Sequence, residues 1–590
     1  MPGGLLQLVA YGQENIILTG NPSTTFFKAS YKKFTPFGMQ RFRIDYEGQR
    51  TLSFDSAVEM NFKIPRYAEL LWDTYIVVNL PDIWSPLFYR DNVPGKYVPY
   101  EFQWVNDIGF AMIRQITIHS GGSTLAQYSG EWMMNAIRRD EVARRSLLGR
   151  MVGGDNQTKE LSDPKTYWGG NYPNAIPDSD CSPNCNGSKI NTVGLEPSIR
   201  GRQLYIPLMA WFCYTTKTAL PLIALQYQEV YIKIEFSPIK DLFTIFDVEQ
   251  GMKRGSRSSC TNDPPPCKNC EENSNLYVPE LTLKRKAPNC ASITDQLWKF
   301  IQPPMALPQN EEENHLLYLN RRNDWNSDVH LIGTYIFLGE EERRINAKKC
   351  HSILIKEQFE WDYLNITGSK RVDIPSKDMV SSYMWRFRRS DVNKRNQWFN
   401  YSNFEFEGVP GQPPTIKNIN GSTPLTPFGP PAVASNPFGL YNSGCATIKN
   451  QKNIMLNMAI LCGQDYRENI LAAGVYAFIE KWYRTTGISK YGLYCYNFCT
   501  NSNRLIYQPT GAQNTNKWQY ITFEFNTIQP PKNPDADNTV DVLCDPSGAI
   551  IGVRKDLWSL NEYNFDLRVF EERYNMIEIQ GGRIGLSIAR

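Results

Sequence analysis

Short segments with the alternation typical of strands dominate the chain. The clearest is 230–236, Val-Tyr-Ile-Lys-Ile-Glu-Phe, where every second side chain is apolar. This pattern predicts a strand with one face in a core and the other toward solvent. A β-branched segment at 72–81 ends in a proline, and 116–119 is followed by two glycines. Further strand-like segments lie at 335–338, 491–496 and 520–525.

One helix is expected over 131–148, where apolar side chains at 132, 133, 136 and 137 form a single stripe. Helices and strands do not alternate regularly, so a parallel α/β sheet is not indicated. The many short strands and the 78 glycine and proline residues instead predict an all-β protein with antiparallel sheets and long loops.

Three stretches without periodic pattern resemble insertions between strands. Residues 150–200 are rich in Gly, Asn, Pro, Asp and Ser, residues 250–290 carry a triple proline, and residues 408–445 are rich in proline. Loops of this length inside a compact domain are uncommon and usually form functional surface. We expect rigid sheets from which these three loops project.

Composition and charge narrow the functional classes. The 63 basic and 60 acidic residues leave a net charge of only +3, which argues against direct nucleic-acid binding through a basic surface. The longest apolar run, 471–479, is far shorter than the roughly 18 residues of a membrane span. No secretory signal is evident, so we expect a protein made in the cytosol.

Catalytic motifs are not found. The chain contains neither the G-x-x-x-x-G-K-[ST] phosphate loop nor the G-x-S-x-G nucleophile turn. Its four histidines are too far apart in sequence for a metal-binding facial triad, namely His119, His315, His330 and His351. We therefore predict no enzyme activity, no catalytic residue, no cofactor and no metal site among these histidines.

The cysteines leave three states open. Six of the thirteen lie in or beside the first two insertions: Cys181, Cys185, Cys260, Cys267, Cys270 and Cys290. One Cys-x-x-Cys pair is present, but a structural zinc module normally has two such pairs. Free thiols, late-formed disulfides and a zinc site are all compatible with this spacing, and free thiols are favoured.

Five Asn-x-Ser/Thr tripeptides are candidate N-glycosylation sites. They begin at Asn156, Asn186, Asn365, Asn400 and Asn420. Most lie in or beside polar loops, where a bulky glycan is tolerated.

An ordered set of motifs resembles one protein family. The N-terminal segments 3–12, 18–22 and 25–35 are similar to the start of the major capsid proteins of nucleocytoplasmic large double-stranded DNA viruses, which include algal and amoebal giant viruses. Further similar segments follow in the family's order at 104–109, 121–122, 130–132, 219–236, 342–347, 508–514, 574–577 and 585–586.

The resemblance implies a double jelly roll, two tandem eight-stranded sandwiches with long inserted loops and a few short helices. The implied domains are an N-terminal arm at 1–26, a first jelly roll at 27–340 and a second at 341–590. The implied function is a structural subunit of an icosahedral virion shell, assembled as a pseudo-hexagonal homotrimer around a double-stranded DNA genome. Implied partners are neighbouring capsomers and minor capsid and penton proteins, with an inner membrane contacted only indirectly.

The resemblance also implies roles for two sets of apolar residues. In the family the N-terminal segment contacts neighbouring shell proteins at the inner side. Here that role would fall to Leu5, Leu6, Leu8, Val9 and Tyr11. The aromatic pairs 211–212 and 482–483 are candidate trimer contacts, although ordinary core positions are commoner for such residues. A minor capsid or penton protein and a carbohydrate-binding β-sandwich protein remain as alternative functions.

Overall fold

The computed structural model describes most of the 590-residue chain. The described residues are 3–10, 12–48, 50–84, 86–89, 97–100, 102–141, 145–154, 197, 199–247, 285–303, 305, 316, 318–408, 417–418, 441–442, 451–505, 508–533, 541–544, 549–554 and 560–589. The predicted insertions at 150–200, 250–290 and 408–445 therefore lie largely outside the described residues.

Residues 37–338 contain two main antiparallel sheets, one of five strands and one of four. In sheet 1A the order is β1 (Phe37–Asp45), β16 (His330–Leu338), β4 (Leu70–Leu80) and β10 (Arg202–Pro207), with the short β11 (Leu220–Pro221) also paired to β4. In sheet 1B the order is β3 (Val58–Lys63), β12 (Val230–Phe236), β8 (Ile113–Ser120) and β9 (Ser123–Tyr128).

The second half repeats this arrangement strand for strand. In sheet 2A the order is β17 (His351–Ile366), β29 (Phe565–Gln580), β19 (Met379–Arg389) and β24 (Leu493–Asn497), joined by the short β25 (Gln513–Asn514) and β30 (Arg583–Leu586). In sheet 2B the order is β18 (Ser369–Ile374), β26 (Ile521–Thr527), β22 (Met455–Cys462) and β23 (Asp465–Ala472). Each half is an eight-stranded jelly roll, and the chain is a double jelly roll.

The shorter elements connect or flank these sheets. The remaining strands are β2 (Thr51–Ser53), β5 (Leu87–Tyr89), β6 (Tyr97–Pro99), β7 (Gln103–Trp104), β13 (Phe243–Phe246), β14 (Arg285–Lys286), β15 (Asp324–Asn326), β20 (Lys417–Asn418), β21 (Tyr441–Asn442), β27 (Asp541–Cys544) and β28 (Ile550–Arg554). The α-helices include α1 (Gly3–Val9), α2 (Ile16–Thr19), α3 (Ile108–Ala111), α4 (Gly130–Asp140), α5 (Arg145–Val152), α7 (Trp211–Tyr214), α11 (Glu340–Lys348) and α12 (Glu480–Arg484).

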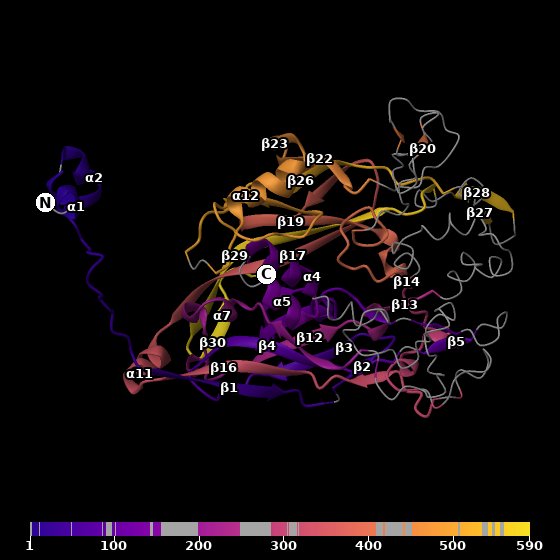
Figure 1. Cartoon of the computed structure of the whole chain (residues 1–590), viewed down its shortest axis with the longest axis horizontal. Helices are drawn as coiled ribbons and strands as arrows, with labels where there is room; N and C mark the ends of the chain where they lie inside the picture. The colour runs from indigo at the N-terminus through magenta and orange to yellow at the C-terminus, as the bar shows by residue number, and fades with distance from the viewer. Residues whose placement is uncertain are drawn as a thin grey trace.

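The two jelly rolls lie one above the other in Figure 1, with sheet 1A along the lower side of the molecule and sheet 2B along the upper side. Helix α4 lies between them. Helix α11 connects the last strand of the first jelly roll to the first strand of the second. In both jelly rolls the A sheet therefore lies below the B sheet in this view, so the two halves have the same orientation rather than facing each other.

The alternating segments in the sequence become strands with the predicted faces. In β12, residues alternate between buried and partly exposed along all seven positions. The segments expected at 72–81, 116–119, 335–338, 491–496 and 520–525 lie within or overlap β4, β8, β16, β24 and β26. Each sandwich encloses a core of aromatic and aliphatic side chains, such as Phe62 and Trp104 in the first and Trp385 and Phe523 in the second.

The predicted single helix over 131–148 is wrong in its extent. Helix α4 ends at Asp140, because Glu141 has extended backbone angles (φ −121°, ψ 117°). A second helix, α5, begins at Arg145. The side chains that end α4 are held by charged partners in the second jelly roll, and the apolar stripe alone does not reveal those partners.

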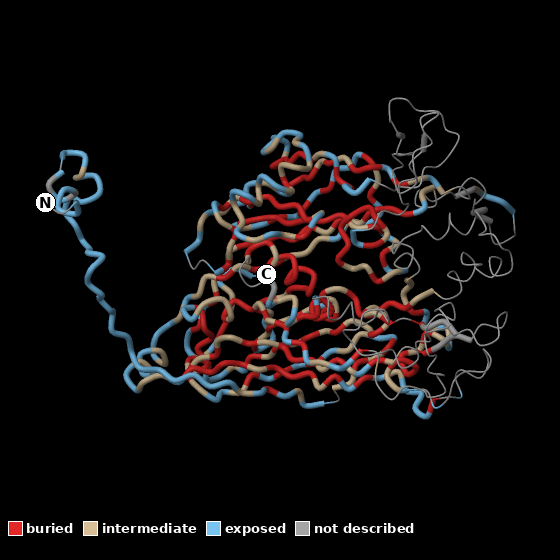
Figure 2. The backbone as a smooth tube through the Cα atoms, in the orientation of Figure 1, coloured by how far each residue is buried: buried red, intermediate tan, exposed pale blue. Residues whose placement is uncertain are grey.

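The N-terminal segment extends away from the body of the molecule (Figures 1 and 2). Its helices α1 and α2 are followed by backbone that is neither helix nor strand as far as residue 36. Nearly every described side chain in this segment is exposed, including Phe26 (99%) and Phe27 (98%).

Candidate assembly surfaces

Helix α4 is one of the elements that join the two jelly rolls. Ser129 caps its N-terminus, since the Ser129 hydroxyl accepts a hydrogen bond from the Trp132 backbone N–H at 3.1 Å. The Ser129 backbone N–H and hydroxyl both donate to Glu360 of β17, at 3.0 and 2.6 Å. The cap therefore starts the helix and also attaches it to sheet 2A.

A buried cluster surrounds Glu131 in the first turn of α4. The Glu131 carboxylate accepts two hydrogen bonds from Arg386 of β19, at 2.7 and 3.1 Å, and one from Arg568 of β29 at 3.0 Å. The hydroxyl of Tyr401 donates to the same carboxylate at 3.1 Å. Burial raises the pKa of Glu131, but the positive charges of Arg386 and Arg568 outweigh burial and hold that pKa far below 4.5.

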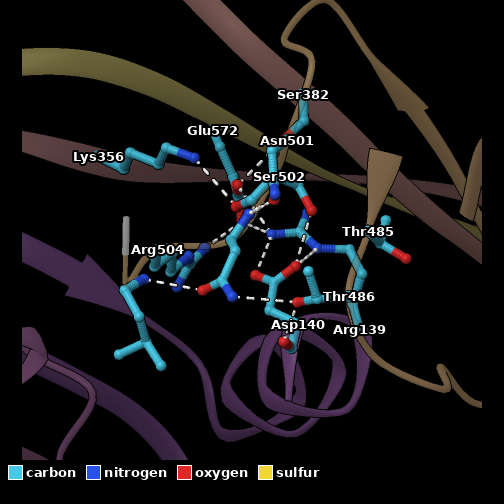
Figure 3. A network of polar contacts seen from close by, with 12 residues as sticks. Arg139, Asp140, Lys356, Ser382, Thr485, Thr486, Asn501, Ser502, Arg504 and Glu572 are labelled. Carbon is cyan, nitrogen blue, oxygen red and sulfur yellow. Dashed lines mark hydrogen bonds and ion pairs between the residues drawn. The ribbon is translucent and has the colours of Figure 1, made fainter. Parts of the chain in front are cut away.

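A second buried cluster lies at the C-terminal end of α4 (Figure 3). Arg139 donates to the adjacent Asp140 at 2.9 and 2.8 Å and to Glu572 of β29 at 3.2 Å. Glu572 also accepts hydrogen bonds from Arg504 and, at 2.9 Å, from the hydroxyl of Ser382. Burial raises the pKa of Glu572, yet Arg139 and Arg504 more than offset this and hold the pKa far below its ordinary value.

Apolar side chains fill the space between these two clusters. Trp132 and Met133 of α4 belong to the same buried core as Met384 and Phe570, which lie on the face of sheet 2A turned toward the first jelly roll. The guanidinium of Arg504 lies 3.8 Å from the centre of the Trp132 ring, a cation–π contact. The interdomain contact thus combines an apolar core with paired charges, and fixes the two sandwiches in one orientation.

Nothing in these clusters is arranged for catalysis. Their carboxylates are all engaged by arginines, and they lie in the interior rather than in a cleft. Among the described residues, no group of three His, Cys, Asp or Glu side chains could hold a metal ion. No described helix has the length and apolar character needed to cross a membrane.

The two aromatic pairs predicted as trimer contacts have different environments. Trp211 (5% exposed) and Phe212 (0%) belong to the core of the first jelly roll. Trp482 (81%) and Tyr483 (76%) project from α12 into solvent. With the exposed Phe478 and Ile488 they line an open groove of about 970 Å³.

The predicted contact residues of the arm are described in part. Leu5, Leu6 and Leu8 lie on α1 and are all exposed. The side chain of Val9 and the whole of Tyr11 lie outside the described residues.

Two of the five candidate glycosylation sites are described, and their environments differ. Asn365 is exposed at the end of β17, with a left-handed backbone (φ 57°). Asn400 is buried, and its side-chain amide donates to the Phe404 carbonyl at 2.8 Å while its oxygen accepts from Ser402. A glycan on Asn400 would have to displace these buried contacts, so Asn365 is the more accessible of the two sites. Asn156, Asn186 and Asn420 lie outside the described residues.

The histidines and cysteines have ordinary surroundings where they are described. The His119 ring stacks on Tyr231 with a centroid distance of 5.4 Å, and both His330 and His351 contact backbone carbonyls. Cys290 is a free thiol, partly buried against the first core. Cys181, Cys185, Cys260, Cys267, Cys270 and His315 lie outside the described residues.

The charged clusters around α4 were not anticipated from the sequence. In β19, arginines at 386 and 388 alternate with Trp385 and Phe387, a pattern typical of a strand with one solvated face. The structure instead covers that face with α4. The sequence signal for these clusters is the number of charged residues in otherwise apolar strands. That number does not identify the partners of the charged residues.

Comparison with known proteins agrees with this architecture. The model of a family described as "Major capsid protein N-terminus" matches residues 25–262. The major capsid protein of Phaeocystis pouchetii virus is 32% identical over 243 residues, which cover 41% of this chain and 42% of the relative. That of Chrysochromulina ericina virus is 30% identical, with the same two coverages. The match therefore spans less than half of the length of these two relatives.

Other similarities extend over the full chain. The major capsid protein of Paramecium bursaria Chlorella virus 1 is 23% identical over 100% of both chains. Among solved structures, the chain in the quasi-atomic model of the PBCV-1 virus capsid has a TM-score of 0.54 at 15% identity, covering 96% of this chain and 100% of that one. The Faustovirus major capsid protein has a TM-score of 0.52 at 12% identity, covering 97% and 94%. From the match of residues 25–262, these relatives and the shared double jelly roll, the chain is similar in sequence and in fold to the major capsid proteins of large DNA viruses.

Proposed function

We propose that this chain is the repeating structural subunit of an icosahedral virion shell and has no catalytic role. Three copies form a pseudo-hexagonal capsomer, and capsomers tile the shell that encloses a double-stranded DNA genome. The observation that carries the proposal is the repetition of one jelly roll within the chain, with the same strand order in sheets 1A and 2A and in sheets 1B and 2B. Three such chains supply six similar units, which is the number that hexagonal tiling requires.

The rigid connection between the jelly rolls supports this function. A shell subunit must keep its two halves at a fixed angle, because errors in that angle accumulate around a ring of copies. The buried clusters at Glu131 and Glu572 hold α4 on sheet 2A from both ends of the helix. Neighbouring capsomers and minor capsid and penton proteins are the expected partners. We expect no sequence-specific nucleic-acid contact, and only an indirect connection to an inner membrane.

The native mass of the purified chain tests the proposal. Native mass spectrometry or light scattering should give a species at three times the chain mass of 67.8 kDa. Electron microscopy of that species should show plates with a hexagonal outline. A chain that stays monomeric at high concentration and in the presence of shell partners would overturn the proposal.

A further inference from the structure

The second jelly roll contains a helical segment equivalent to α4, but this segment does not cover a sheet of the other jelly roll. Helix α4 lies between β9 and β10, and in the second jelly roll the equivalent connection between β23 and β24 holds the π-helical turn η11 (Val475–Ile479) and α12. The two jelly rolls thus carry a helical segment at the same place in the same fold. One segment covers a neighbouring sheet and the other does not.

The burial of the equivalent strands shows the same difference. In β9, Leu125 (0% exposed) and Tyr128 (2%) are buried. In β23, Tyr466 (50%) and Ile470 (57%) are exposed, and no described residue of the strand is buried. Exposed aromatic and aliphatic side chains on an edge strand are unfavourable for a free subunit. We group them with the exposed side chains of η11 and α12 and call this set the helix-side surface: Tyr466, Ile470, Phe478, Ile479, Trp482 and Tyr483.

The sheets show a complementary difference. The face of sheet 2A that α4 covers includes Met384 and Phe570, both 0% exposed. On the equivalent outer face of sheet 1A, Met39 (55%) and Tyr205 (37%) are exposed in a single copy, although Val77 (1%) and Ile336 (6%) on the same face are buried. Tyr205 lies against Tyr75 of β4 with ring centroids 6.1 Å apart, beside the partly buried Ile332. We call the outer face around Met39, Tyr75, Tyr205 and Ile332 the sheet-side surface.

These two surfaces lie on opposite sides of the molecule. In Figure 1, α12 and β23 lie along the upper side, and β1 and β16 lie along the lower side. In Figure 2, exposed stretches follow both sides, while the layers between them are largely buried. A contact between two different surfaces on opposite sides is heterologous, and it leads from one copy to the next around a ring.

We propose that the helix-side surface of one copy packs on the sheet-side surface of a second copy, as α4 and β9 pack on sheet 2A within one copy. The inference rests on the proposed function and adds to it the residues of the contact between copies. Trp482 and Tyr483 are the anchors, since large aromatic side chains in a central groove carry most of the binding free energy at protein interfaces. Around the capsomer, the contact between the two jelly rolls of one chain then alternates with the contact between neighbouring copies.

Two double variants test the contact from its two sides. Trp482→Asp with Tyr483→Asp places charges on the helix-side surface, and Met39→Asp with Tyr205→Asp places them on the sheet-side surface. All four side chains are exposed in a single copy, so we expect each variant to fold with an unchanged circular dichroism spectrum and to have the native mass of one copy. The matched control is Tyr227→Asp, because Tyr227 is as exposed as Tyr483 (76% for both) and belongs to neither surface. The control should remain trimeric.

Mixing the two double variants distinguishes a heterologous contact from a symmetric one. Each variant keeps the surface that the other has lost, so a mixture should form a dimer with one copy of each, although neither variant associates alone. A wild-type trimer whose two variants remain trimeric would overturn this contact and leave the proposed function intact. A monomeric wild-type chain would instead overturn the proposed function. A mixture that stays monomeric, or a control that dissociates, would also count against the proposed pairing of surfaces.

Discussion

Removing the negative charge of Glu131 should destabilise the folded chain more than any exposed charge substitution. In Glu131→Gln, the side chain keeps its size, but Arg386 (1% exposed) loses its buried counter-charge. Arg568 loses one of its carboxylate partners, at 3.0 Å. Loss of one partner from a buried ion pair costs about 3–5 kcal/mol, because the remaining charge stays desolvated.

The magnitude can be measured as a melting temperature. For domains of 150–250 residues, about 1 kcal/mol corresponds to roughly 2–4 °C, so the loss predicts a fall of about 6–20 °C. Differential scanning calorimetry of the purified chain measures this change. The control is Glu340→Gln on α11, where Glu340 and Arg344 form an exposed i,i+4 pair with side chains 79% and 73% exposed. Such a pair contributes about 0–1 kcal/mol.

A second substitution separates lost charge from altered packing. In Glu131→Gln combined with Arg386→Met, no unpaired guanidinium is left at the position of Arg386, so part of the lost stability should return. If Glu131→Gln lowers the melting temperature no more than Glu340→Gln does, the cluster does not hold the two jelly rolls together, and the reasoning about α4 is wrong.

The described contacts lead to four further predictions. First, the folded chain should lose stability in acid, because the pKa values of Glu131 and Glu572 lie far below the ordinary 4.5. The contribution of these two carboxylates to stability is complete above pH 4.5 and declines as the pH falls toward their folded-state pKa values, so a melting temperature constant from pH 7 to about pH 3 would contradict this. Second, Gly487→Ala should cost about 1–3 kcal/mol, because its Cβ would lie 2.5 Å from the backbone oxygens of Arg138 and Arg139; Gly585→Ala, with open space around the added carbon, is the control, and equal melting temperatures would refute the close approach. Third, glycopeptide mass spectrometry should find no glycan on the buried Asn400, whereas the exposed Asn365 is free to carry one; a modified Asn400 would contradict the description of its loop. Fourth, deleting the arm residues up to 35 should leave the melting temperature unchanged, because their described side chains are exposed or nearly so; a large fall would show that the arm packs on the body.

The sequence predicts the strands well because each face of a strand lies in a single environment, either the core or the solvent. In β12 the alternation of Val230, Ile232, Ile234 and Phe236 with polar residues matches their burial position by position. Period-two patterns of this kind depend only on neighbouring residues, so they can be recognised without knowing the topology. The resemblance of ordered motifs to one family then supplies the double jelly roll.

The interdomain clusters could not be predicted in the same way. Glu131 and Arg386 are 255 positions apart in the chain, and nothing local indicates that they meet. The alternation in β19 distinguishes a core face from a polar face, but a polar face covered by a helix has the same pattern as a solvated one. The aromatic pairs pose a similar problem: Trp211–Phe212 and Trp482–Tyr483 have equivalent sequence character, and only their three-dimensional surroundings separate core from surface.

The contact between the two jelly rolls and the proposed contact between copies use different chemistry. The difference follows from how each contact forms. Within one chain, the jelly rolls are covalently linked, so their contact bears no cost of bringing separate molecules together and can include charges that are expensive to desolvate. Between copies, association must overcome the loss of translational and rotational freedom. In the proposed contact, burial of Trp482 and Tyr483 would provide a favourable free energy for this step that a desolvated ion pair does not reliably provide. The difference also prevents mispairing. If α12 of another copy displaced α4 from sheet 2A, its aromatic side chains would leave Arg386 and Glu572 without the partners that α4 supplies. Specificity is commonly achieved through such unpaired buried charges.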